Sequence, residues 1–374
     1  MLKRYYNDLS NLFTRRNVLV IYGARRTGKT TLLKEFLANS NMSSRYDTGD
    51  NINIRQLFEE ARYDDLIDYA GDYDLIAIDE AQEILNISKS IKILADHTDT
   101  KIILTGSSSF KIAQDIGEPL TGRKRSVKLF PFSISELRLN YSKFDIKNNL
   151  EKYMLYGTYP EIITGKHKKE KILILNELVE SYLLKDIFAH ERIRSPKVLV
   201  QILKLLAYQI ASEVSMNELA RKTGVDVKTV SRYLDMLEKC FVIFRLTPYS
   251  RNLRNEITSK SKFYFWDLGI RNALISQFAP LSDRIDNGAM FENFIIIERM
   301  KKHTYEDFYG SIYFWRQRNG REIDLIEEID GKQIAVEIKF SPTKKPKLPN
   351  AWLTAYPDAE FKVINRENFL NFIS

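Results

Sequence analysis

The stretch that decides the fold is residues 17–30, which read NVLVIYGARRTGKT. Residues 17–22 form a short, apolar, β-branched run, which predicts a buried parallel strand. Residues 23–30 have the spacing of a phosphate-binding loop, and residues 31–37 continue with the apolar spacing of a helix. Because strand, loop and helix follow in the order that this motif needs, we expect phosphates to bind at the helix N-terminus.

Each residue type in this loop has a chemical role. The glycines let backbone N–H groups turn toward the α- and β-phosphates, the Lys29 ammonium reaches the β- and γ-phosphates, and the Thr30 hydroxyl is a Mg²⁺ ligand. No Asn/Thr-Lys-x-Asp guanine-reading sequence occurs in the expected region, so we expect ATP and Mg²⁺ as cofactors. The residues expected around the nucleotide are Gly23, Ala24, Arg25, Arg26, Thr27, Gly28, Lys29, Thr30 and Thr31.

Two further apolar runs predict strands that end in polar residues. Residues 75–78 lead into Asp79 and Glu80, where the first carboxylate can hold Mg²⁺ through water and the second can polarise the attacking water. Residues 101–105 lead into a serine-rich turn. In that turn, Ser107 either senses the γ-phosphate or belongs to a cap of the next helix.

A basic turn follows at residues 120–125, with the sequence LTGRKR. Arg123 can stabilise charge that develops on the γ-phosphate, in its own subunit or in a neighbouring one. The alternative is an ordinary solvated basic turn, and the sequence leaves both open.

The middle of the chain predicts helices over residues 131–212, followed by a helix-turn-helix at residues 215–237. Strands at residues 242–246 and 262–266 would flank a basic wing at residues 249–254. This winged helix either contacts DNA or serves as a protein-binding spacer. The side chains expected to face DNA are Lys228, Thr229, Ser231 and Arg232, and those expected to be buried are Leu219, Ala220, Val225, Val230, Leu234 and Leu237.

A lysine-rich stretch precedes the helix-turn-helix. Residues 166–171 read KHKKEK, which is typical either of a patch that contacts phosphates or of a solvated loop, and the solvated loop is favoured.

The C-terminal third predicts a helix at residues 288–299 and strands at residues 312–316, 322–326 and 334–340. Asp324 and Glu337 fall among apolar neighbours on adjacent strands, where a divalent cation would offset the cost of burying them. Lys339 shares a strand face with Glu337, and Glu292 on the helix can complete a Mg²⁺ or Mn²⁺ ligand set. Such a set would cleave phosphodiesters. An ion pair of Asp324 or Glu337 with Lys339 or Arg321 is an equally good interpretation.

Composition limits the remaining possibilities. The 374 residues include 57 Lys+Arg, 49 Asp+Glu, one cysteine and four histidines without ligand spacing. These counts exclude an internal disulfide and a cysteine-based zinc site. The net charge of +8 permits DNA binding without requiring it. No run of about 18 apolar residues and no signal peptide occurs, so we expect a cytoplasmic protein that does not enter a membrane.

The motifs together resemble a family of prokaryotic AAA-type ATPases with a C-terminal domain related to the PD-(D/E)XK nucleases. The stretches that carry the resemblance are residues 23–30, 79–82, 106–109, 120–123, 157–161, 185–187, 265–269 and 337–339, with Glu292 and Asp324. The resemblance implies an α/β fold with four parts. They are a P-loop ATPase core at residues 1–135, a helical lid at 136–208, a winged helix at 209–266 and a restriction-endonuclease-like domain at 267–374.

The resemblance also places Glu292, Asp324, Glu337 and Lys339 at metal and catalytic positions of the nuclease superfamily. Two functions remain open. One is an ATPase whose nucleotide cycle gates metal-dependent DNA cleavage, and the other is a nucleotide-switched module that binds DNA or a protein partner and does not cleave. The oligomeric state is also open, with self-association among the possibilities.

Overall fold

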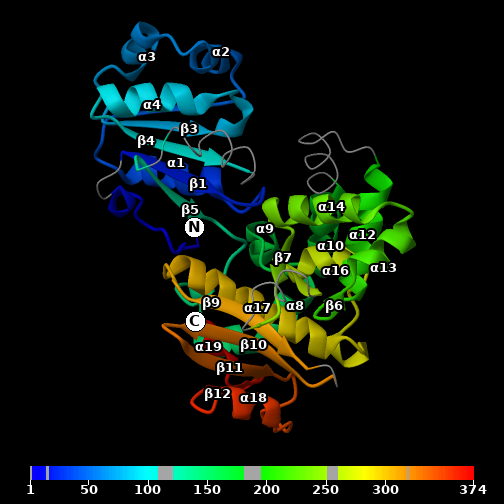
Figure 1. Cartoon of the computed structure of the whole chain (residues 1–374). Helices are drawn as coiled ribbons and strands as arrows, with labels where there is room; N and C mark the ends of the chain where they lie inside the picture. Colours follow the sequence, from blue (N-terminus) through cyan, green and yellow to red (C-terminus); the bar gives the residue numbers. More distant parts are fainter. Residues whose placement is uncertain are drawn as a thin grey trace. The chain divides into compact units, whose positions relative to one another are not determined.

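The computed structural model describes residues 2–13, 17–107, 120, 122–180, 195–250, 260–317 and 320–374 (Figure 1). The chain forms two compact units. Unit 1 consists of Met1–Phe130 with Lys239–Phe241, and unit 2 consists of Pro131–Glu238 and Val242–Ser374. The boundary at 130 lies close to the end expected for the ATPase core, and the predicted boundaries at 208 and 266 fall inside unit 2.

Unit 1 contains a five-stranded parallel sheet in the order β2-β3-β4-β1-β5. The strands are β1 (Val18–Tyr22), β2 (Ser44–Thr48), β3 (Leu75–Asp79), β4 (Lys101–Gly106) and β5 (Lys124–Lys128). The three apolar runs that predicted strands correspond to β1, β3 and β4. Because all five strands run in one direction, the residues that follow β1, β3 and β4 meet at one edge of the sheet.

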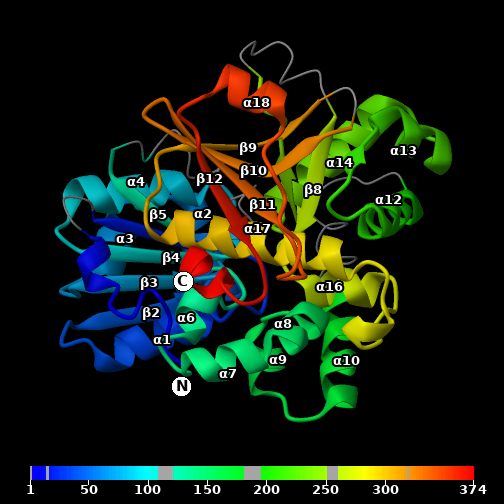
Figure 2. The ribbon, with the colours of Figure 1, turned by 90° about the horizontal axis from the view of Figure 1, so that it is seen from below.

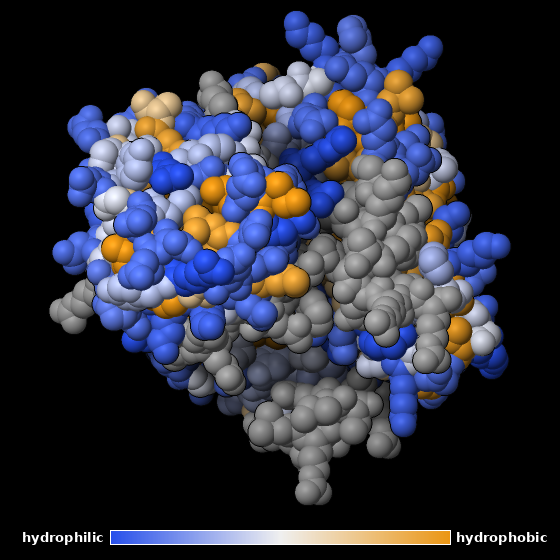
Figure 3. All heavy atoms as spheres, turned by 90° about the horizontal axis from the view of Figure 1, so that it is seen from above, coloured by the Kyte–Doolittle hydropathy of each residue, from blue (hydrophilic) through white to orange (hydrophobic). Residues whose placement is uncertain are grey.

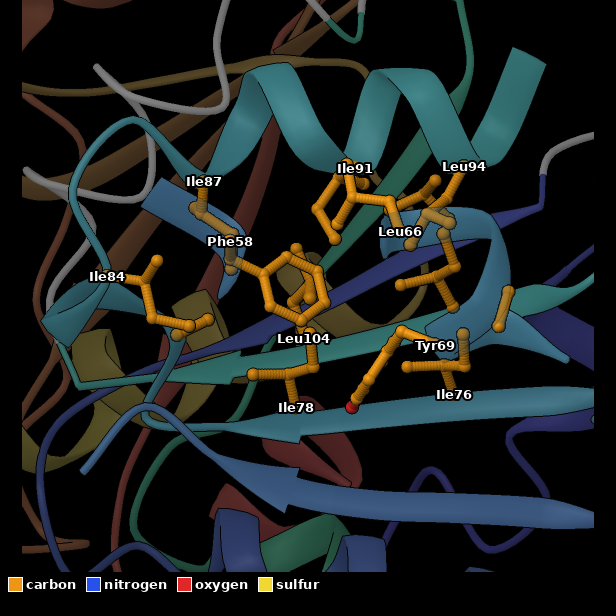
Figure 4. Packing of buried hydrophobic residues seen from close by; sticks show 14 of the residues in the cluster. Phe58, Leu66, Tyr69, Ile76, Ile78, Ile84, Ile87, Ile91, Leu94 and Leu104 are labelled. Carbon is orange, nitrogen blue, oxygen red and sulfur yellow. The ribbon is translucent and has the colours of Figure 1, made fainter. Parts of the chain in front are cut away.

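Helices cover the sheet of unit 1. They are α1 (Lys29–Asn39), α2 (Ile52–Glu60), α3 (Tyr63–Ala70) and α4 (Ile87–His97). On one face, alternate strand residues such as Ile78 and Leu104 pack against Phe58 of α2 and Ile91 of α4 (Figure 4). The three inner strands, β1, β3 and β4, are mostly apolar because both faces of the sheet are buried there, whereas the edge strands β2 and β5 are mostly polar and only partly buried.

The first part of unit 2 is helical, as predicted for the described residues of 131–212. Its helices are α6 (Ile134–Leu137), α7 (Lys143–Asn148), α8 (Leu150–Tyr156), α9 (Pro160–Thr164), α10 (Lys168–Glu177) and α12 (Pro196–Tyr208). Two of the motifs recognised in the sequence meet at the end of α8. The Thr158 N–H donates to Asp267 Oδ2 at 2.7 Å, and a Cβ on Gly157 would lie 2.0 Å from Asp267 Oδ1. Only glycine fits at this junction.

A three-stranded antiparallel sheet, β6-β8-β7, follows in the chain. Its strands are β6 (Glu213–Val214), β7 (Ile243–Leu246) and β8 (Ser261–Phe265), and α13 (Met216–Thr223) and α14 (Val227–Lys239) lie between β6 and β7 in sequence. The Ser215 hydroxyl caps α13 by accepting from the Glu218 N–H at 3.3 Å. The two helices of the predicted helix-turn-helix are therefore present.

Burial on these two helices follows the predicted pattern closely. Val225 is half-buried, and the other five apolar side chains predicted to pack inside are buried. Lys228 and Arg232 are exposed. Thr229 and Ser231 differ from the prediction, because both are half-buried, and the Thr229 hydroxyl donates to Asp226 Oδ2 at 2.9 Å.

The C-terminal part of unit 2 is a four-stranded sheet in the order β12-β11-β10-β9, with α17 alongside (Figure 2). The strands are β9 (Ser311–Arg316), β10 (Glu322–Ile329), β11 (Lys332–Ile338) and β12 (Glu360–Ile364). The helices are α16 (Leu268–Leu274), α17 (Asn287–Tyr305), α18 (Asn350–Ala355) and α19 (Phe369–Ile373). The pairing of β10 with β9 shifts register between Ile323 and Ile326, beside Asp324.

Several predicted features lie outside the described residues. They are residues 108–109 of the serine turn, residue 121 beside Arg123, residues 185–187 and residues 251–254 of the wing. Within the part that is described, no helix combines the length and apolar character needed to cross a membrane. On the face that Figure 3 shows, hydrophilic side chains cover much of the described surface and hydrophobic patches are separated from one another.

A buried ion network joins α17 to the four-stranded sheet. Arg299 donates to both carboxylate oxygens of Glu327, at 2.6 and 2.8 Å, and His303 Nε2 lies 2.7 Å from Glu327 Oε1. Burial by itself raises the pKa of Glu327, but these hydrogen bonds outweigh burial and lower the pKa from 4.5 to about 2.

We expect Glu327→Gln to lower the free energy of unfolding by about 3 kcal/mol at neutral pH, because it leaves the charged Arg299 without its buried partner. Since the folded-state pKa of Glu327 is lowered, its stabilisation is full above pH 4.5 and is lost as the pH falls toward about 2. Urea unfolding of both proteins over this pH range measures the difference.

The matched control for this substitution is Glu306→Gln, which removes an exposed carboxylate just after α17. It should change the free energy of unfolding by less than about 0.5 kcal/mol. Equal stability of Glu327→Gln and the unsubstituted protein would show that the network contributes nothing.

Candidate functional site

The phosphate-binding loop lies between β1 and α1, at the edge of the sheet where the parallel strands end. It packs directly against the chain after β5, because the Leu129 N–H donates to the Tyr22 carbonyl at 2.8 Å. A Cβ on Gly23 would lie 2.0 Å from the Leu129 carbonyl oxygen. The first loop glycine is therefore required by close backbone approach.

The Lys29 ammonium is folded onto the loop itself. Its Nζ donates to the carbonyl oxygens of Gly23 and Ala24, at 3.0 and 2.8 Å. Burial lowers the pKa of Lys29 to about 8, while the negative charges of Glu80 and Asp79 act in the opposite direction. A phosphate group at the loop would supply the strong acceptor that these carbonyls replace.

The other loop residues differ in exposure. Thr27 is buried and its hydroxyl donates to the Ala24 carbonyl at 2.9 Å, which closes the turn. Arg25 is half-buried, whereas Arg26 and Thr31 are exposed. These residues stay predicted nucleotide contacts.

The Asp79 carboxylate is where three strands meet. Its Oδ2 accepts from the Thr30 hydroxyl at 2.7 Å and from the Tyr46 hydroxyl at 3.3 Å, and its Oδ1 accepts from the Thr105 hydroxyl. Thr30 opens α1, Tyr46 lies on β2 and Thr105 lies on β4. The pairing of a hydroxyl and a carboxylate oxygen fits the hard oxygen ligands that Mg²⁺ prefers.

Glu80 lies next to this centre in a left-handed backbone conformation, with φ 47°. Gln82 Nε2 donates to Glu80 Oε2, and Gln82 Oε1 accepts from the Ser107 N–H at 3.2 Å. Gln82 therefore joins the predicted water-polarising carboxylate to the predicted sensor turn.

The sequence did not identify Tyr46, Thr105 or Gln82 as site residues. Gln82 lies three residues after Asp79, and its place in the 79–82 stretch that carries the resemblance was an available signal. No sequence pattern marks Tyr46 or Thr105 as a site residue, because it is the order of the strands in the sheet that brings them next to Asp79.

Of the alternatives open for Arg123, the structure does not favour action on the phosphates of its own subunit. Val18 pairs with Lys124 and Tyr22 pairs with Lys128, so Arg123 lies at the start of β5, while the phosphate loop lies at the opposite edge. Its guanidinium pairs there with Asp96 of α4, at 2.5 Å. A role in a neighbouring subunit stays a prediction.

Three of the four C-terminal residues predicted to act together are in contact with one another, namely Asp324, Glu337 and Lys339. Lys339 Nζ lies 2.9 Å from Asp324 Oδ2 and 2.6 Å from Glu337 Oε2, and the Ile338 N–H donates to Asp324 Oδ2 at 2.7 Å. Asp324 projects from the irregular stretch of β10, and β-bulges of this kind re-aim side chains. The two carboxylates therefore converge on one cation, the Lys339 ammonium.

Glu292 reaches this cluster from α17 and is held by two residues of β8. Lys262 Nζ lies 3.0 Å from Glu292 Oε1, and the Tyr264 hydroxyl donates to the same oxygen at 2.8 Å. Lys262 is fully buried and also lies 3.5 Å from Glu322 Oε1. The sequence did not identify Lys262 or Tyr264 as site residues. Their partner Glu292 follows Lys262 by 30 residues and lies on a helix, and no local pattern in β8 indicates such a contact.

Crowding of negative charge and burial shift the protonation of these acids. Burial, followed by the charge of Asp324, raises the pKa of Glu337 to about 6. Burial also raises the pKa of Glu292 to about 7, with the charge of Asp324 adding to the effect and Lys262 opposing it. Both shifts reflect the cost of burying negative charge, which Lys262 and Lys339 offset in part.

The donors in this cluster suit Mg²⁺ or Mn²⁺, since all are carboxylate oxygens. Among the described residues, however, no three His, Cys, Asp or Glu side chains converge as a metal site would require. The ion-pair alternative is the arrangement observed, with Lys339 between Asp324 and Glu337. A second metal site here stays a prediction.

Family models match three consecutive parts of the chain. Residues 15–138 match an AAA domain, residues 147–281 match a domain of unknown function (DUF8612) and residues 287–370 match another domain of unknown function (DUF4143). The first match supports nucleotide binding and hydrolysis by a P-loop domain of the AAA type in unit 1. The other two matches assign no activity.

Uncharacterised proteins from three distant organisms are similar to this chain over most of its length. One from Mycobacterium tuberculosis and one from Methanocaldococcus jannaschii are each 25% identical, over 92% and 93% of this chain and 74% and 80% of their own. One from Haemophilus influenzae is 25% identical over 86% of this chain and 83% of its own.

Solved structures are similar to the chain at a lower level. A Walker-type ATPase of Pyrococcus abyssi has a TM-score of 0.49 at 18% identity, over 74% of this chain and 96% of its own. RuvB of Thermotoga maritima has a TM-score of 0.32 at 16% identity, over 63% of this chain and 85% of its own.

We expect Thr105→Val to raise the Mg²⁺ concentration needed for half-maximal ATP hydrolysis by about ten- to hundredfold. The substitution keeps the side-chain shape and removes the hydroxyl that fixes the Asp79 carboxylate, and removal of a group that orients a metal ligand has effects of this size. A Mg²⁺ titration of steady-state hydrolysis measures it.

The control is Thr100→Val, a buried threonine just before β4 and therefore at the other edge of the sheet. It should leave the Mg²⁺ titration unchanged. The same Mg²⁺ requirement in Thr105→Val and the unsubstituted protein would show that Thr105 does not orient Asp79.

Proposed function

We propose that this chain hydrolyses ATP and couples the nucleotide cycle to DNA engagement and to Mg²⁺- or Mn²⁺-dependent phosphodiester cleavage in unit 2. The observation that carries the first part is the meeting of Thr30, Asp79 and Thr105 beside a phosphate loop whose lysine rests on loop carbonyls. The match of residues 15–138 to the AAA domain supports it.

In the hydrolysis that we propose, each residue has a separate task. The loop amides and the Lys29 ammonium bind the phosphates, and Thr30 and Asp79 hold Mg²⁺, which neutralises charge on the β- and γ-phosphates. Glu80 accepts a proton from the attacking water. Gln82 positions Glu80 and links it to the Ser107 backbone, so a change at the turn after β4 can reach the catalytic carboxylate.

The proposed DNA contact is made by a winged helix. The order α12, β6, α13, α14, β7, β8 supports this proposal, because a winged helix has a helix, a strand, two helices and two strands in that order, and α14 presents Lys228 and Arg232 to solvent. Exposed cations on a second helix suit a DNA groove and its phosphates.

The proposed cleavage site is the carboxylate cluster of unit 2. Asp324 and Glu337 come from neighbouring strands and Glu292 from α17, and the first two share the Lys339 ammonium. Asp324 and Glu337 would hold the divalent cation, which polarises a phosphodiester and its attacking water. Lys339 would orient that water.

A second candidate function is a nucleotide-switched module that binds DNA or a protein and does not cleave. The observation in its favour is that Lys339 and Lys262 already neutralise the carboxylates as ion pairs. In that case the cluster stabilises unit 2, and the nucleotide cycle regulates binding alone.

We expect Lys29→Ala to abolish ATP hydrolysis, because the phosphates lose their cation, and Asp324→Asn to abolish cleavage while hydrolysis remains. The measurement is cleavage of linear, single-stranded, supercoiled and branched DNA with Mg²⁺ or Mn²⁺, with and without ATP, beside an ATP hydrolysis assay. Asp330→Asn, in the exposed turn between β10 and β11, is the matched control and should cleave normally.

Three outcomes separate the two candidates. Metal-dependent cleavage that is lost in Asp324→Asn supports the nuclease, and cleavage that Asp324→Asn retains shows that the assigned site is wrong. Absence of cleavage from protein that hydrolyses ATP favours the second candidate.

DNA binding has its own test. We expect log K for duplex DNA to fall linearly with log salt concentration by about 0.9 for each phosphate that the protein neutralises, and Lys228→Gln with Arg232→Gln to reduce this slope by about two. Fluorescence anisotropy measures both, in the presence of ATP or ADP. A salt-independent signal would indicate a protein partner, and equal affinity in both nucleotide states would exclude a nucleotide switch.

A further inference from the structure

A cavity of about 590 Å³ opens among the first helices of unit 2, away from both sites described above. The helices α8, α9 and α10 lie beside one another and next to α16, and the cavity continues to the segment after α16 (Figure 2). Ligand pockets for small molecules have volumes of about 300–1,000 Å³, so this cavity is large enough for one nucleotide unit.

Aromatic rings form one side of the cavity. Tyr153 and Tyr156 lie one turn apart on α8, and the Tyr156 ring stacks on Phe278 with centroids 5.9 Å apart and an angle of 13° between the planes. The Lys171 ammonium lies 5.9 Å from the centroid of Tyr156. A flat apolar surface beside a cation suits a planar ring that carries a negative charge.

Positive charge dominates the rest of the lining. Four lysines line the cavity, at positions 152, 166, 168 and 171, against one carboxylate, Glu151. Glu151 is already engaged, because its Oε1 accepts the Leu281 N–H at 3.0 Å. Burial, followed by the charge of Lys152, lowers the pKa of Lys171, while the charge of Glu170 opposes the shift.

We propose that this cavity binds a phosphate-bearing planar base, with the base against Tyr156 and Phe278 and the phosphate on Lys168 and Lys171. Two kinds of ligand carry such a phosphate-bearing base, namely a free nucleotide and one nucleotide unit of a single-stranded nucleic acid. The site lies in unit 2 and makes no use of the phosphate loop, so it goes beyond the proposed function. It also gives the lysine-rich stretch at residues 166–171 the phosphate-contacting role that the sequence left open.

The test uses the full chain with its phosphate loop filled by a saturating non-hydrolysable ATP analogue. The probes are 2-aminopurine deoxyriboside monophosphate and a short single-stranded oligonucleotide that carries 2-aminopurine, whose fluorescence is quenched by stacking. We expect binding with quenching, and at least about tenfold weaker binding to a variant with both Lys168→Gln and Lys171→Gln. The salt dependence of oligonucleotide binding should also become shallower by about 0.7 for each phosphate that this variant no longer neutralises.

Lys169→Gln is the matched control, because Lys169 lies on the same helix and does not line the cavity. Its affinity should stay within about twofold of the unsubstituted protein. Phe278→Leu, at a half-buried position, should reduce the quenching by removing one ring of the stack. Thermal unfolding of each variant shows whether it folds. If Phe278→Leu does not fold, the test rests on the double lysine variant, whose two substitutions lie at exposed and half-buried positions.

Each outcome decides the proposal. Binding of both probes identifies a site open to free nucleotides, and binding of the oligonucleotide alone identifies a site for a nucleic-acid strand. The proposal is overturned if neither probe binds, if the double lysine variant binds as tightly as Lys169→Gln, or if an acidic peptide displaces the oligonucleotide at equal concentration. ATP hydrolysis and DNA cleavage are measured separately, so failure here leaves the proposed function standing.

Discussion

The hydrogen bonds that converge on Asp79 are the constraint on which unit 1 depends. A carboxylate at this depth needs donors, and it receives them from Thr30, Tyr46 and Thr105. These donors can meet only if β4 lies between β1 and β3 with all strands parallel. The core of Figure 4 fixes that order by packing α2, α3 and α4 on one face. The apolar strands and the polar site at their ends are therefore two consequences of one arrangement.

In unit 2, buried carboxylates find their partners in ion pairs. Glu298 and Lys301 of α17 are both buried, 2.7 Å apart, and Lys301 Nζ also donates to the Phe132 carbonyl at 3.3 Å. Glu298 Oε2 accepts the Ile134 N–H. Burial of such pairs gains little stability by itself, but removal of one partner is costly. The point at which the chain enters unit 2 is therefore fixed to the helix that also carries Glu292.

The features that could be predicted from the sequence are those that depend on residues close together in the chain. The phosphate loop, the strands before it and before Asp79, and the two helices of the helix-turn-helix follow from spacing within a few residues. Other site residues come together only because of how the strands are ordered and packed, and no local sequence pattern encodes that arrangement. They are Tyr46, Thr105, Lys262 and Tyr264. Arg123 is a different case. In a parallel sheet, a residue just before one strand lies at the edge opposite to a loop that follows another strand, and this rule could have been applied to the sequence alone.

Glu292 and its neighbour Asn293 tie helix α17 to strand β8 within unit 2. Strand β8 holds α17 through Lys262 and Tyr264, and Asn293 bonds to both the N–H and the carbonyl of Phe265, at 2.8 and 2.9 Å. Separating the three-stranded sheet from α17 would break all of these buried contacts together. Strand β8 and the helix that carries Glu292 are therefore held together by buried contacts. In the coupling that we propose, a change in unit 2 that shifted β8 relative to α17 would have to break these contacts, so we expect β8 and α17 to move together.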